Sequence, residues 1–160
     1  MTPPIFYRSI IVSTAQQMDA LQIKIPMGTE ARVLLIAIAG QESGWANRRQ
    51  IGGSARGYWQ FEKGGGVAEV FQKTPNQLRT ICESLDIPFD QATVFEAMAW
   101  NDMLSCIMAR LLLWQDPAAL PASGDKATAW NYYLRNWRPG APRSESWPAR
   151  YDEAAAAISG

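Results

Sequence analysis

The chain has 160 residues, the length of one domain, and its composition, 48% hydrophobic and 19% charged, is typical of a globular protein with a buried core. Its 15 basic and 15 acidic residues give a net charge of zero, so neither nucleic acid nor an anionic membrane is an expected partner. Histidine is absent, which excludes Ser-His-Asp and Cys-His catalysis and any His-ligated zinc or haem site.

Helical periodicity dominates the first part of the chain, up to a glycine-rich segment. One helix is expected over 7–23, and a second begins at Thr29, a residue suited to capping a helix. Residues 33–39 of the second helix are apolar on every face, which predicts that this helix is buried at the centre of the domain. From Gly44 to Gly66 the periodicity disappears, so irregular backbone is expected there before helical structure resumes over 67–72.

The rest of the chain is also expected to be helical. The predicted helices are 74–85, 91–114, 126–136 and 146–157. No repeat or linker divides the sequence, and no alternating strand pattern is present. The sequence therefore predicts one all-α domain over residues 1–160, with six or seven helices around a buried central helix.

Two further features concern compartment and redox state. Cys82 and Cys106 are the only cysteines and match no metal-binding spacing; their apolar neighbours favour two buried thiols, with a disulfide as the alternative. The N-terminal residues contain no basic segment followed by a long apolar one, so neither a signal peptide nor stable insertion into a membrane is expected. We expect synthesis in the cytoplasm.

Glu42 stands where the apolar helix stops and the glycine-rich segment starts. Partial desolvation at such a position disfavours the carboxylate and raises its pKa. Glycosidic bond cleavage needs a carboxylic acid that is still protonated near neutral pH, because the leaving oxygen must receive a proton. Glu42 is therefore a candidate general acid, and an ordinary surface glutamate is the alternative interpretation.

Three short segments together resemble a known family. Glu42-Ser43, the turn Gly57–Gln60 and the segment Ala129–Asn131 are similar in order and spacing to the Glu-Ser, Gly-Leu-Met-Gln and Ala-Tyr-Asn motifs of soluble lytic transglycosylases and goose-type lysozymes. The resemblance covers about Thr29 to Arg138. It implies an all-helical, lysozyme-like fold, a bacterial peptidoglycan substrate and a single catalytic glutamate, which falls on Glu42.

Glu62 is the candidate for a second acid. In goose-type lysozymes the similar position carries an acid that helps to place a water molecule, whereas lytic transglycosylases use the substrate's own 6-hydroxyl and leave a 1,6-anhydro sugar. If Glu62 faces Glu42 across a cleft, inverting hydrolysis is plausible. The alternative is that Glu62 pairs with Lys63 or faces solvent.

The motifs depart from the family in their aromatic residues, and these residues complete the expected site. The turn carries two aromatic residues in place of Leu-Met, and the family's Ala-Tyr-Asn tyrosine is replaced by a tryptophan, so its phenol would have to come from Tyr132 or Tyr133. Trp59 and Trp130 are equally compatible with a sugar-binding groove and with the core. The residues expected to orient Glu42 or bind substrate are Ser43, Tyr58, Trp59, Gln60, Trp130, Asn131 and Tyr132.

These expectations define a muramidase acting between N-acetylmuramic acid and N-acetylglucosamine, without a metal or organic cofactor. Lytic transglycosylation is one alternative, and a non-catalytic glycan-binding or structural virion protein is another. A wall-cleaving enzyme without an export signal reaches the wall through lysis or inside a particle. That reasoning suggests a bacteriophage endolysin or virion-associated lysin, dependent on a holin or on the virion for access.

Overall fold

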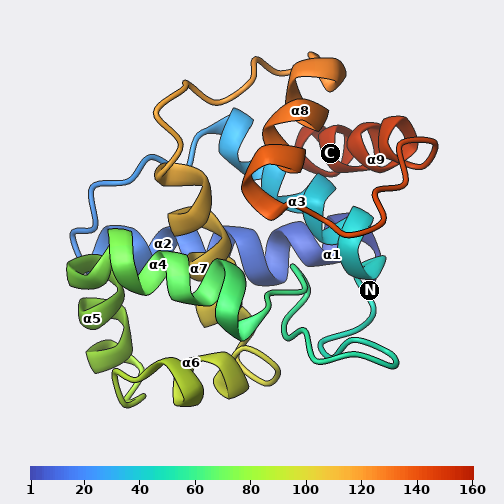
Figure 1. Ribbon diagram of the computed structural model, residues 1–160. Helices are drawn as coiled ribbons and strands as arrows, with labels where there is room; N and C mark the ends of the chain where they lie inside the picture. The colour runs from blue at the N-terminus through green and yellow to red at the C-terminus, as the bar shows by residue number, and fades with distance from the viewer.

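The computed structural model describes residues 1–160 and is helical throughout, with no β-strand (Figure 1). Some helices run on through π-helical segments, labelled η1 and η2. The elements are α1 Pro3–Phe6, η1 Tyr7–Val12, α2 Ser13–Ala20, α3 Thr29–Ser43, η2 Lys63–Val67, α4 Ala68–Lys73, α5 Pro75–Ser84, α6 Gln91–Ala97, α7 Asp102–Trp114, α8 Lys126–Trp137 and α9 Trp147–Ser159. The prediction of an all-α chain is confirmed.

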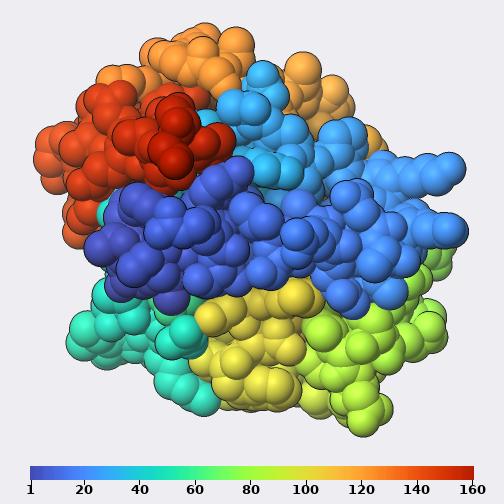
Figure 2. Space-filling view, turned by 180° about the vertical axis from the view of Figure 1, so that it is seen from behind, coloured from blue at the N-terminus to red at the C-terminus, as the bar shows by residue number.

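The buried central helix is confirmed as α3, and a second helix shares its role. Every residue from Val33 to Gln41 is buried, as the all-round apolar sequence predicts. Every residue from Leu104 to Leu113 in α7 is buried as well. Seen from behind, the continuous helix α1–η1–α2 crosses the middle of the molecule between the C-terminal helix and the segment around residue 100 (Figure 2). The core is thus built around two helices, where the sequence predicted one.

The helix expected over 91–114 is two helices, and this part of the prediction was wrong. The chain leaves α6 after Ala97, and Asn101 takes up an extended backbone conformation (φ −115°, ψ 97°). The Asn101 side chain accepts a hydrogen bond of 2.9 Å from the backbone N–H of Leu104, which caps α7. This break gives 8 continuous helices, one more than the larger number expected.

The segment between α3 and η2 is irregular, as predicted, but helical structure resumes at Lys63, four residues before the predicted Val67. It folds back on itself through two isolated antiparallel bridges, Arg49 with Arg56 and Arg56 with Phe61. Gly57 has φ +73°, and a Cβ atom there would lie 2.1 Å from Ser105 Oγ, so only glycine fits at this contact. The turn between Gly57 and Phe61 is thereby held against α7.

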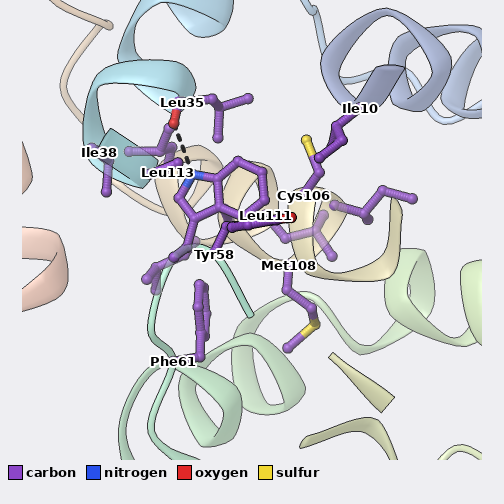
Figure 3. Close-up of a cluster of buried hydrophobic side chains, with 14 of the residues drawn as sticks. Ile10, Leu35, Ile38, Tyr58, Phe61, Cys106, Met108, Leu111 and Leu113 are labelled. Atoms are coloured by element: carbon purple, nitrogen blue, oxygen red, sulfur yellow. Dashed lines mark hydrogen bonds between the residues drawn. The ribbon is translucent and has the colours of Figure 1, made fainter. Parts of the chain in front are cut away.

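One apolar cluster fills the interior, and Figure 3 shows part of it around Leu35, Leu111 and Leu113. Cys82 and Cys106 both lie in this cluster as free thiols, which confirms the first of the two interpretations of the cysteines. None of the helices has the length and apolar character needed to cross a bilayer.

Candidate functional site

A groove of about 790 Å³ opens where α3 ends. One wall is the glycine-rich segment, and the other is the C-terminal part of α8 with the loop that follows it; Figure 1 shows this loop above the glycine-rich segment. Glu42 and Glu62 both line the groove. The two acids that the sequence singled out are therefore brought to one site.

Glu42 occupies the last turn of α3, and the helix stops directly after it. Gly44 takes the left-handed conformation (φ 61°) and its N–H bonds to the carbonyl of Gly40, a common way to end a helix. Burial raises the pKa of Glu42 above its ordinary value. Two groups oppose burial and lower this pKa in part: the hydroxyl of Tyr133, which bonds to the carboxylate, and the positive charge of Arg143.

The sequence offered two tyrosines, Tyr132 and Tyr133, as the source of a phenol near Glu42, and Tyr133 is the one that lines the groove. Its hydroxyl donates a hydrogen bond of 2.6 Å to Glu42 Oε1. The ring stacks on Trp147 of α9, with centroids 5.5 Å apart and an interplanar angle of 10°, and it also contacts Trp130 at 5.3 Å. Burial and the neighbouring Glu42 raise the pKa of Tyr133 far above its ordinary value. Tyr133 is therefore a fixed, neutral hydrogen-bond donor to Glu42.

Glu62 lies on the opposite wall and is exposed. The preceding residue, Phe61, is anchored by two backbone hydrogen bonds of 2.9 Å to Arg56 and by an edge-to-face contact with Trp137. The Glu62 carboxylate itself makes no hydrogen bond or ion pair. Glu62 therefore does not pair with Lys63, which was one of the alternatives considered for it. Its carboxylate is open to a water molecule or ligand.

Gln60 is the one predicted substrate-binding residue that lines the groove. It adopts the left-handed conformation (φ 49°), and its side-chain amide donates to the carbonyl of Gly57 at 2.8 Å. No hydrogen bond from the protein reaches Gln60 Oε1, which leaves this oxygen available as an acceptor in the groove.

The two aromatic residues of the turn lie in the core and do not line the groove, so the core interpretation of Trp59 is the one the structure has, and Tyr58 is not placed to bind substrate there. Trp59 is fully buried, and its indole N–H donates to the carbonyl of Leu35 at 2.8 Å. Tyr58 is also buried and meets the ring of Phe6 edge to face at 5.2 Å. Because the turn folds onto the core, its flat side chains fill space between α1 and α3.

The three residues predicted on α8 lie on sides of the helix that do not face the groove. Ser43 on α3 also lies outside the groove. Tyr132 is buried and donates to the carbonyl of Leu113, Trp130 packs against Trp147 of α9, and Asn131 is exposed outside the groove. Ser43 is buried, and its hydroxyl donates to the carbonyl of Ala39. None of these four lines the groove, so they are not placed to bind a ligand there, and for Trp130 the structure has the core alternative.

The groove face of α8 consists of Tyr133, Asn136 and Trp137, a spacing of three and four residues that places side chains on one side of a helix. Given that Tyr133 faces the groove, the sequence alone would have indicated Asn136 and Trp137 as its neighbours on the same side of the helix. Gln41 and Arg143 also line the groove and were not predicted. No group of three or more acidic or cysteine side chains that could hold a metal ion is present.

Comparison with known proteins adds no relative: family models, curated proteins and solved structures were all searched, and none matches the chain. The geometry of the groove therefore has to support any functional assignment.

Proposed function

We propose that this protein is a peptidoglycan-cleaving glycosidase with a lysozyme-like domain, acting on the β-1,4 bond between N-acetylmuramic acid and N-acetylglucosamine. The observation that carries the proposal is the position of Glu42: a half-buried carboxyl with a raised pKa, at the floor of an open groove. A protonated carboxyl in a sugar-sized cleft is the group needed to protonate a leaving glycosidic oxygen.

The surrounding groups fit the proton transfer. When Glu42 gives up its proton, a negative charge develops on a partly desolvated carboxylate. Tyr133 already donates to Oε1 at 2.6 Å, and Arg143 lies close enough to lower the pKa. Both groups stabilise the carboxylate product of the transfer more than the acid that precedes it. Glu62, unpartnered on the opposite wall, would activate a water molecule in the hydrolytic reaction.

Lytic transglycosylation is the second candidate, and one observation favours it. Glu62 is exposed, and no hydrogen bond holds its carboxylate in place, whereas an efficient general base is held by its neighbours. If the substrate's 6-hydroxyl attacks instead of water, Glu62 is not needed. Mass spectrometry of digested peptidoglycan separates the two candidates, since 1,6-anhydro products arise only from transglycosylation.

The decisive experiment is a wall-turbidity assay on the wild type, Glu42→Gln and Glu145→Gln. General acid catalysis contributes about 10²- to 10⁴-fold, so Glu42→Gln should lose at least about 100-fold in rate. Glu145 is an exposed glutamate outside the groove, and its substitution should leave the rate unchanged. Equal lysis by all three proteins would show that Glu42 is not the acid, and no lysis by any of them would favour a non-catalytic glycan-binding or virion role.

A further inference from the structure

Arg143 is held at the edge of the groove by a reciprocal clamp. Its Nη2 donates to the backbone carbonyl of Gln41 at 3.0 Å, and the Gln41 side-chain amide donates back to the carbonyl of Arg143 at 2.9 Å. Ser146 closes the clamp by donating to Gln41 Oε1 at 2.9 Å. An exposed loop residue is thereby fixed beside the end of α3, next to Glu42.

Of the basic side chains that line the groove, Arg143 is the one without an ion-pair partner. Arginines 138 and 143 are the only basic residues that line it. Arg138 is paired with Glu69 at 2.7 Å. Arg143 has no carboxylate within ion-pair distance, and its Nε and Nη1 groups make no hydrogen bond with the protein. Nη2 also keeps a second N–H beyond its bond to Gln41, and together with Nε or Nη1 it can give a carboxylate two parallel hydrogen bonds.

Glu42 is not the anion that Arg143 faces at the moment when substrate binds. A general acid must be protonated, hence neutral, when substrate binds. In that state Arg143 has no counter-charge from α3, and the other acid of the groove, Glu62, makes no ion pair with it. The positive charge is therefore available to the ligand.

We propose that Arg143 forms an anion subsite that binds a carboxylate carried by the glycan strand. This inference rests on the proposed function and assigns to one residue the recognition of an acidic group on its substrate. Peptidoglycan shares its β-1,4 backbone with chitin but carries carboxylates, either on the lactyl group of a peptide-free muramic acid or on the peptide stem. An arginine fixed in the groove would make the protein prefer the acidic polymer.

Binding calorimetry in a Glu42→Gln background tests the proposal without requiring turnover. The probes are chitohexaose, which has no carboxylate, glycan strands stripped of their peptides, and strands that keep their stems. Adding Arg143→Gln should weaken binding of the carboxylate-bearing strands about tenfold and change chitohexaose binding less than twofold. The stripped strands bind through the lactyl carboxylate alone, so the strand type that shows the larger loss identifies the source.

Two control variants separate the charge from the clamp. Ser146→Ala removes one hydrogen bond of the clamp and keeps the guanidinium, so its loss on the acidic strands should be smaller than that of Arg143→Gln. Arg138→Gln removes an arginine that is already neutralised and should lose less than Arg143→Gln. Arg143→Lys keeps the charge but not the planar pair of donors, and an intermediate loss is expected. Raising the salt concentration should weaken binding of the acidic strands only.

Equal losses on chitohexaose and on acidic strands would overturn the anion subsite, as would a Ser146→Ala loss as large as that of Arg143→Gln. The proposed function fails differently: the wild type would then leave the cell wall uncut in the turbidity assay, whatever the binding data show. If Arg143→Gln does not fold, the salt dependence of the parent decides, since salt-independent binding of acidic strands contradicts the proposal.

Discussion

At the scale of single residues, Glu42 combines opposing influences that suit an acid catalyst. Burial at the end of α3 favours the protonated form, while the hydroxyl of Tyr133 and the charge of Arg143 favour the carboxylate. The result is a pKa above the ordinary value of 4.5, held by groups that also stabilise the ion once the proton has left. Each influence can be removed separately.

Tyr133→Phe should change the pH profile of the reaction. The hydroxyl lowers the pKa of Glu42, so its removal raises that pKa, and the acid stays protonated to higher pH. The basic limb of the kcat profile should therefore move to higher pH. The plateau rate should fall about tenfold, because a hydrogen bond to a charged group contributes about 1.5–3 kcal/mol.

Tyr132→Phe is the matched control for this change. Tyr132 is the adjacent tyrosine, and its hydroxyl donates to the carbonyl of Leu113, outside the groove. Its substitution should leave the pH limbs where they are. A basic limb that stays in place in Tyr133→Phe, or moves equally in both variants, would contradict the role given to Tyr133.

Glu42→Gln should make the protein more stable above neutral pH. The folded pKa of Glu42 is raised above its unfolded value, so the folded state binds this proton more tightly. The associated stability is complete below the ordinary pKa of 4.5 and is lost as pH rises through the folded pKa. Glutamine has no charge to desolvate and can still accept from Tyr133, so the variant escapes this loss.

The gain is measured from urea unfolding at low pH and at pH 8. The unfolding free energy of Glu42→Gln should exceed that of the wild type at pH 8 by about 1.4 kcal/mol for each pH unit between the two pKa values. The difference should shrink towards pH 4. Glu145→Gln, at an exposed position outside the groove, is the matched control for the loss of a carboxylate. A Glu42→Gln protein that is less stable at pH 8 would mean that the carboxylate stabilises the fold.

At the scale of elements, sequence reasoning succeeded where the signal was local. The all-round apolar run of α3 and the glycines after it were sufficient to predict its burial and the position of Glu42 at its end. The break at Asn101 was missed because the apolar sequence continues through Met98, Ala99 and Trp100. Periodicity has no feature there that separates one long helix from two.

The groove wall on α8 was missed for a tertiary reason. The motif comparison indicated Ala129–Asn131, but the rotation of α8 is fixed by the packing of Trp130 and Tyr133 on Trp147 of α9. That contact joins residues from separate helices, and no local pattern reports it. Arg143 lies in a loop without periodicity, so only the folded structure brings it to Glu42.

The turn that carries Gln60 depends on Gly57, and Gly57→Ala should be strongly destabilising. A methyl group there would meet Ser105 Oγ at 2.1 Å, in addition to the strain of φ +73°. Gly44→Ala is the control, since Gly44 has φ +61° and open space around it. We expect a loss of about 1–2 kcal/mol in Gly44→Ala from strain alone and about 1–3 kcal/mol more in Gly57→Ala.

Denaturant unfolding of both variants gives two unfolding free energies, and their difference is the contribution of the contact with Ser105 beyond backbone strain. Because Gln60 lines the groove three residues later, Gly57→Ala should also impair glycan binding more than Gly44→Ala does. Equal unfolding free energies for the two variants would show that α7 yields easily at Ser105, and that the turn is not held in place by this contact.

At the scale of the whole molecule, one cluster of 41 buried residues links the helices across the chain. The groove does not divide this cluster, because its floor is the end of α3 and its walls rest on side chains of the same core, including Phe61 and Tyr133. We therefore expect the chain to unfold as one cooperative unit, without a separately stable half.

The two free thiols report on this cooperativity from different parts of the core. Cys82 in α5 and Cys106 in α7 are buried, and burial raises their thiol pKa values to about 11 and about 12. A thiol reagent that attacks the thiolate must wait for the protein to open. Cys82→Ala and Cys106→Ala each leave one thiol, and that thiol should be labelled at a rate set by global unfolding. After correction for the stability of each variant, the two sites should give the same free energy of opening. Faster labelling at Cys82, with Cys106 still protected, would instead show that α4 and α5 open on their own, which would leave the glycine-rich wall of the groove attached to a locally unfolding unit.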